Sequence, residues 1–159
     1  MKSIYPTCHL GKLVKVEGGK RLPRGERYAQ QNTKYPYLRV CDFVRGTIDE
    51  TKLRFLTEET QYKISQYTIS SDDVYISIAG TIGIVGTVPE HLSNANLTEN
   101  AAKLVIKDKN KLDRSYLVYY LNTLGQYQIE KQVNITSQSK LALFRIEKIK
   151  IPLPSLEKQ

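Results

Sequence analysis

The chain has 159 residues, enough for one domain with a sizeable core but not for a second domain of ordinary size. No apolar run approaches the roughly 18 residues that a membrane-spanning helix needs, and the start of the chain lacks the hydrophobic segment of a signal peptide, so we expect a soluble, cytoplasmic protein with no membrane contact. Two cysteines, Cys8 and Cys41, are too few for a disulfide framework. With His9 and His91 they show no metal-ligand spacing, so we expect neither a metal nor a cofactor.

Charge is distributed unevenly along the chain, whose formal net charge is +8. Residues 1–45 hold ten Lys and Arg against three acids, residues 46–100 hold three against eight, and residues 101–159 hold eleven against five. If the two basic ends meet in the fold, they form one cationic face suited to a polyanion such as DNA. Charge alone leaves an ordinary basic protein equally open.

Short apolar runs, several with alternating β-branched residues, fill the chain up to about residue 107 and are separated by turn residues. This pattern is typical of strands. The predicted strands are 10–16, 37–40, 53–56, 74–79, 82–88 and 104–106, followed by a last strand over 146–151.

One long helix is predicted over 113–133. Its buried face is marked by helical spacing at Leu117, Tyr120, Leu121 and Leu124. Gly125 lies within this helix and favours a kink or an early end. The elements together predict an α+β fold that is mostly β, a twisted and barrel-like sheet with one long helix packed on it.

The first of three notable loops, residues 17–27, combines glycine with a high density of basic residues. Its cations are Lys20, Arg21, Arg24 and Arg27. Backbone N–H groups freed by glycine, together with guanidinium groups, suit phosphates and guanine edges. The alternative is a solvated hairpin tip.

The second loop, Ala-Gly-Thr-Ile-Gly-Ile-Val-Gly at 79–86, forms a tight turn between two buried strands. It has neither the G-x-G-x-x-G order nor the Gly-Lys-Ser/Thr ending of a phosphate-binding loop, and a strand follows where a helix is needed. A nucleotide site is therefore rejected. The glycines favour positive φ or close approach of another backbone, with DNA as one candidate and Thr81 at the tip.

The third loop spans 134–140 and is polar and small. Its amide, hydroxyl and ammonium groups can reach bases or phosphates, and a loop that caps the preceding helix is the alternative. The candidate residues are Asn134, Ser137, Gln138 and Lys140.

The tail, residues 151–159, passes through two prolines into a predicted helix start. Pro152 and Pro154 fix φ and extend the preceding residues, which makes a stiff spacer. Ser155 is a predicted N-cap and Glu157 suits the first turn. A disordered, proline-containing terminus is the alternative.

The order of these pieces resembles the target recognition domain of the specificity subunit of type I restriction-modification systems. The match spans nearly the whole chain, and each motif is weak by itself. The matching motifs are Leu10-Gly11-Lys12-Leu13-Val14, the Gly-Gly-x-x-Leu-Pro loop, Tyr37-Leu38-Arg39-Val40 with Asp42, Asp73-Val74-Tyr75-Ile76-Ser77, Gly80-Thr81-Ile82-Gly83, residues 94–100, Tyr119-Tyr120-Leu121-Asn122 and residues 151–159.

The resemblance implies a noncatalytic module that reads one half of a split double-stranded DNA sequence and directs methyltransferase and restriction subunits. Residues 1–151 would form the recognition domain, and 152–159 the start of a helical spacer that is cut short. The family's usual subunit carries two such domains, whereas this chain holds one, so we expect a truncated or half-length form that can pair with itself. The family's common Pro-Pro and Glu-Gln endings appear here as Pro154-Ser155 and Glu157-Lys158-Gln159.

Within this reading the expected contacts divide between phosphates and bases. Lys20, Arg24 and Lys140 are assigned to phosphates. Base edges are assigned to Arg21, Arg39, Gln138 or Asn134, and Arg27, Thr81 and Ser137 complete the candidate DNA-binding set.

Two other function classes stay open. A nuclease would use Asp42, Glu50 and Lys52 to hold Mg²⁺ and orient water. An amino-methyltransferase would need an Asn-Pro-Pro-aromatic motif and a glycine-rich cofactor loop, and the sequence has neither. A protein-interaction module, one that binds a methyltransferase subunit without touching DNA, would use the eleven tyrosines as interface residues.

Overall fold

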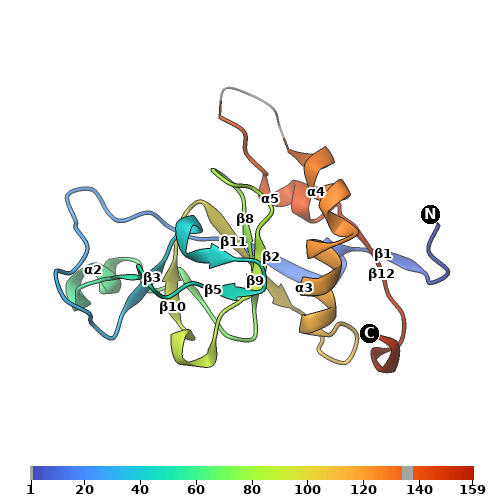
Figure 1. The fold of residues 1–159 in the computed structure, drawn as a ribbon, viewed down its shortest axis with the longest axis horizontal. Helices are drawn as coiled ribbons and strands as arrows, with labels where there is room; N and C mark the ends of the chain where they lie inside the picture. The colour runs from blue at the N-terminus through green and yellow to red at the C-terminus, as the bar shows by residue number, and fades with distance from the viewer. Residues whose placement is uncertain (1, 134–137) are drawn as a thin grey trace.

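The computed structural model describes residues 2–133 and 138–159, and its centre is a four-stranded antiparallel sheet (Figure 1). The strand order is β2 (Val14–Gly18), β11 (Ala101–Ile106), β8 (Val74–Ser77) and β9 (Val85–Thr87). Leu104 of β11 lies opposite Val16 on one side and Val74 on the other. Both faces of this sheet are covered, because alternate residues of β8 belong to two different hydrophobic clusters.

A second sheet covers one of these faces. Its order is β6 (Arg54–Phe55), β3 (Pro36–Leu38), β10 (Ala95–Leu97) and β7 (Thr68–Ile69), with β3 and β10 parallel. Between the sheets, Tyr75 is fully buried and stacks on Phe43 with ring centroids 4.1 Å apart. The smaller elements of this side are η1 (Val40–Asp42), the hairpin β4 (Phe43–Val44) and β5 (Thr47–Ile48), α2 (Glu58–Lys63) and η2 (Glu90–Leu92).

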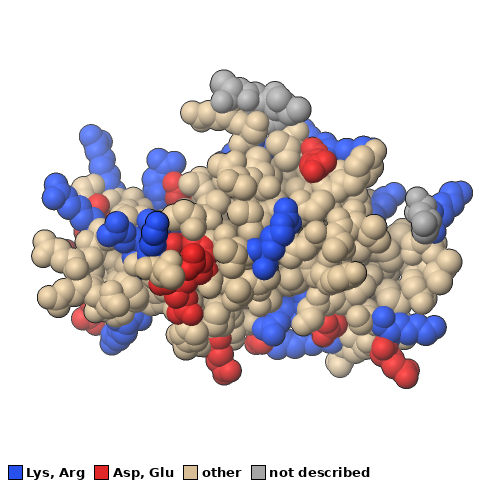
Figure 2. All heavy atoms as spheres, viewed as in Figure 1, with Lys and Arg blue, Asp and Glu red and all other residues tan. Residues whose placement is uncertain are grey.

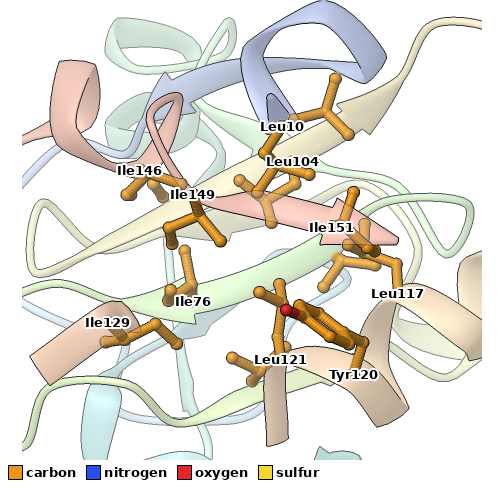
Figure 3. Packing of buried hydrophobic residues seen from close by; sticks show 14 of the residues in the cluster. Leu10, Ile76, Leu104, Leu117, Tyr120, Leu121, Ile129, Ile146, Ile149 and Ile151 are labelled. Carbon is orange, nitrogen blue, oxygen red and sulfur yellow. The ribbon is translucent and has the colours of Figure 1, made fainter. Parts of the chain in front are cut away.

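Helices cover the other face of the central sheet. They are α1 (Leu10–Leu13), α3 (Arg114–Asn122), α4 (Gly125–Gln132) and α5 (Leu143–Ile146), accompanied by the antiparallel pair β1 (Thr7–His9) and β12 (Lys150–Pro152). A hydrophobic cluster fills the space between these helices and the sheet. Figure 3 shows that it contains Ile76 and Leu104 of the sheet, Leu117 and Leu121 of α3, and Ile129 of α4. The fold is therefore three layers: helices, central sheet and second sheet.

The α+β class is confirmed, but the expectation of a mostly β domain with one long helix is not. Helix and strand each take about a quarter of the chain, at 26% and 27%, and the strands form four separate sheets among the described residues rather than one barrel. The predicted helix over 113–133 is divided at Thr123. A Cβ on Gly125 would lie 3.0 Å from the Tyr120 carbonyl oxygen, so glycine allows α4 to start tightly against the end of α3.

Two predicted strands begin as helix. The run at 10–16 opens with α1, and the run at 146–151 opens with the last residue of α5. Tertiary contacts explain this, because Leu10 N donates to Ile149 O and Gly11 N donates to Glu147 O, which joins the two segments. A Cβ on Gly11 would meet the Glu147 Cβ at 2.8 Å, so the joint requires glycine.

The tail is ordered against the domain, which contradicts the alternative of a disordered terminus. Leu153 N donates to Pro6 O at 2.9 Å. The Gln159 amide accepts from Asp113 N and donates to Lys111 O, both at 2.8 Å. Ser155 stands at the N-cap of η3 (Leu156–Lys158), although its side chain makes no capping hydrogen bond. The described helices include none long and apolar enough to cross a membrane.

Candidate nucleic-acid interface

The structure brings the first loop, the β8–β9 loop and the segment after residue 137 to one place. Lys140 pairs with Ala79 in an antiparallel bridge, and Leu141 N donates to Ile78 O at 2.9 Å. Gly18, Gly19 and Lys140 line one hollow of about 500 Å³ together with Ile78 and Glu99. Three segments that are distant in sequence therefore share one surface, as the cationic-face hypothesis requires.

A second hollow, of about 410 Å³, lies next to the first. Arg21, Arg39, Tyr28 and Asn100 are among its lining residues. Glu99 lines both hollows. Arg21 and Lys140 are thus placed on neighbouring parts of one surface, and the turn between β10 and β11 stands between them.

Gly19 has a structural role that differs from the predicted one. Its N–H donates to Ala101 O, and Lys20 N donates to Leu97 O at 2.8 Å. A Cβ at position 19 would lie 2.1 Å from Thr98 O and 2.2 Å from Leu97 O. The glycine therefore lets the loop cross the end of β10, and these two N–H groups are used inside the protein rather than held for phosphate.

The far part of the same loop presents the free cations. Arg24 and Arg27 flank a turn at Gly25 (φ +86°), are exposed, and have no hydrogen bond or ion pair within the described part of the chain. Glu26 fixes this turn to α2, since it accepts from Thr60 Oγ1 at 2.9 Å and pairs with Lys63. Figure 2 shows Lys and Arg side chains projecting from the end of the molecule where this loop lies in Figure 1.

Lys20 is also exposed, and its ammonium lies over the Tyr67 ring, 5.7 Å from the centroid. Thr81 is exposed at the tip of the β8–β9 loop, two residues from the bridge to Lys140. Gln138 is exposed at the edge of the described segment. Asn134 and Ser137 lie outside the described residues.

Arg39 faces the second hollow, but its guanidinium is held by the fold. Nε donates to Asp42 Oδ2 at 3.1 Å, and Nη2 donates to Asp42 Oδ1 at 2.9 Å and to Lys52 O at 2.6 Å. Hydrogen bonding to the buried Asp42 carboxylate raises the pKa of Arg39. These contacts give Arg39 a structural task that competes with base reading.

The residues of the nuclease alternative do not converge on a metal. The Asp42 carboxylate is 2% exposed and both of its oxygens are occupied by Arg39. Glu50 pairs instead with His91, with 2.7 Å between Oε1 and Nε2. Among residues 2–133 and 138–159 there is no group of three or more His, Cys, Asp or Glu side chains arranged to hold a metal ion.

Arg45 is a candidate that the sequence analysis missed. It stands in the β4–β5 turn, donates to Asn122 Oδ1 at 3.0 Å, and lines a hollow of about 390 Å³ with Gly80 and Ile82 of the β8–β9 loop. The turn is docked on β9, where Gly46 N donates to Val85 O. The signal in the sequence is Phe-Val-Arg-Gly-Thr-Ile, an Arg-Gly pair between two short runs that contain β-branched residues, which favours a hairpin with a cation at its tip.

The comparison with known proteins identifies the family. The model of the type I restriction modification DNA specificity domain matches residues 5–159, and the chain belongs to this family. The chain is 28% identical over 129 residues to the Methanocaldococcus jannaschii protein described as the specificity subunit of the type I restriction enzyme MjaX. This match covers 79% of this chain and 30% of that protein. It is 25% identical over 122 residues to the type I restriction enzyme EcoBI specificity subunit of Escherichia coli, covering 77% and 26%.

The fold is also similar to that of solved structures. A chain from a structural study of assembly and conformational transition in the type I restriction-modification system matches with a TM-score of 0.74 at 19% identity, covering 99% of this chain and 36% of that chain. The present chain thus spans 26–36% of the length of these relatives. The specificity subunit is the noncatalytic component of a type I system, which confirms the expectation that this domain is not an enzyme.

Proposed function

We propose that this domain reads one half of a bipartite double-stranded DNA site, and that the specificity subunit containing it directs methyltransferase and restriction subunits to that site. The observation that carries the proposal is the convergence of the basic loop, the β8–β9 loop and Lys140 on adjoining hollows of one surface. Family membership as a DNA specificity domain supports the same reading.

We assign each side chain a contact according to where it lies and whether other groups of the protein already hold it. Arg24, Arg27 and Lys140 are exposed cations and neutralise phosphates, which sets register without carrying sequence information. Arg21 lines the second hollow and Thr81 is exposed at the tip of the β8–β9 loop. Both contact base edges, where an arginine recognises guanine O6 and N7. Arg39 and Lys20 support the surface through Asp42 and Tyr67.

Fluorescence anisotropy with a mixed-sequence duplex at low salt tests the proposal. Replacing either Arg24 or Arg27 by alanine should weaken binding uniformly across sequences and reduce the slope of log affinity against log salt by about 1 for the phosphate that is no longer neutralised. Lys111→Ala is the matched control, because Lys111 is an exposed cation beside the η3 end of the chain. Absence of binding by the unaltered chain, or equal losses of affinity in the control, would contradict the proposal.

A further inference from the structure

The turn between β10 and β11, Thr98-Glu99-Asn100, carries chemistry that none of the assigned roles uses. Glu99 is the only acidic side chain among the described residues that line the two adjoining hollows. Its neighbours there include Arg21, Arg39 and Lys140. A lone carboxylate at the centre of a cationic surface needs a physical reason, because it weakens the attraction of that surface for phosphate.

The ion pair of Glu99 with Arg21 does not account for a carboxylate at this position. Arg21 Nε and Glu99 Oε1 are 3.6 Å apart, beyond hydrogen-bond distance, and the two side chains are 76% and 32% exposed. Ion pairs this exposed contribute about 0–1 kcal/mol because solvent screens them and holding two long side chains costs entropy. The pair therefore contributes little to stability and leaves the carboxylate with acceptor capacity.

The turn itself is held firmly. Thr98 N donates to Leu38 O at 3.0 Å, and Asn100 O accepts from Ile78 N at 2.8 Å. Thr98 Oγ1 donates to Glu99 Oε2 at 3.0 Å, so one carboxylate oxygen is oriented from within the turn. Gly19 packs directly on the Thr98 carbonyl. A carboxylate on such a fixed turn is preorganised, which reduces the entropy lost when it binds a partner.

The chemistry of DNA limits what this carboxylate can contact. Phosphate oxygens repel it, whereas the exocyclic amino groups of cytosine and adenine in the major groove donate hydrogen bonds to it. We propose that Glu99 reads a base of the half-site by accepting a hydrogen bond from such an amino group, cytosine N4 or adenine N6. The inference rests on the proposed function and assigns it a specificity-determining residue.

Selection from a randomised duplex pool, followed by sequencing, tests this with the unaltered chain, Glu99→Ala and Glu90→Ala. Glu90 is an exposed acid in η2, outside both hollows, so its variant removes the same charge without removing the proposed contact. Glu99→Ala should reduce discrimination at one base pair by about tenfold or more, as expected for one good base contact, while the other positions and the salt slope are kept. Cytosine at the affected position assigns the N4 group, and adenine assigns N6.

The outcomes separate the two proposals. If the unaltered chain enriches no motif, the proposed function fails and this inference with it. If a motif is enriched and Glu99→Ala enriches the same motif with the same discrimination, only the role of Glu99 is refuted. A uniform gain in affinity for all duplexes would also refute it, because that result needs only the loss of one negative charge. Matching circular dichroism and unfolding midpoints of the variants would show that the fold is retained.

Discussion

Replacement of Gly19 by alanine should remove a large part of the stability of this domain, although the added group is a single methyl. The methyl would lie 2.1 Å from Thr98 O and 2.2 Å from Leu97 O, and both obstacles are backbone atoms at the end of β10. A side chain could rotate away, whereas this backbone is fixed by the second sheet. The loop must therefore move off the turn.

The cost follows from the hydrogen bonds that this movement breaks. The bonds from Gly19 N to Ala101 O and from Lys20 N to Leu97 O both disappear, at about 1 kcal/mol each. Overpacking adds about 1–3 kcal/mol. The total, about 3–5 kcal/mol, is a large fraction of the roughly 5–15 kcal/mol that stabilises a typical domain.

Gly18→Ala is the matched control, one residue away. A Cβ at position 18 would meet only Leu143 Cδ1 at 3.6 Å, an ordinary contact, and reduced freedom of the unfolded chain should make this change neutral or stabilising by up to about 1 kcal/mol. Urea unfolding followed by far-ultraviolet circular dichroism measures both variants. A Gly19→Ala protein within about 1 kcal/mol of Gly18→Ala would refute the close-approach argument.

Three further changes test other parts of the structure. Arg39→Ala should cost about 3–5 kcal/mol in urea unfolding, because it leaves the buried Asp42 carboxylate without its cation, and a cost below about 1 kcal/mol would show that the pair is dispensable. Burial raises the pKa of Tyr75 above 10.0, the pKa of the tyrosine in the unfolded chain. The free energy of unfolding of the unaltered chain, relative to that of Tyr75→Phe, should therefore be constant below pH 10.0 and decrease as the pH rises above it. Parallel alkaline unfolding curves for the two proteins would contradict this. Burial also raises the pKa of Asp73 above 3.8, so the stability of the unaltered chain relative to Asp73→Asn should decrease as pH rises through the acid range, and an increase measured by thermal unfolding would show that the hydrogen bond from Ser70 N outweighs burial.

The local sequence pattern was sufficient to predict several elements and the basic loop. Alternating β-branched residues place β8 within the predicted run at 74–79, and the density of Arg24 and Arg27 identifies the exposed tip. Such features can be predicted because strand periodicity and solvent exposure of charge depend on neighbours in sequence. The resemblance to specificity subunits, which depends on the order of short motifs, was confirmed by the family comparison.

The sequence by itself determined the cationic ends, the family and part of the strand pattern, such as β8. Only the tertiary structure decided which charges face the candidate interface. Arg39 is held in the fold by Asp42 and by the carbonyl of Lys52, while Arg45 lines a separate hollow beside the β8–β9 loop because its hairpin is hydrogen-bonded to β9. Glu99 reaches the centre of the site because β10 and β11 belong to different sheets and the turn between them crosses the loop at Gly19. The physical reason is that each of these placements depends on contacts between segments far apart in the chain, and local periodicity carries no record of such contacts.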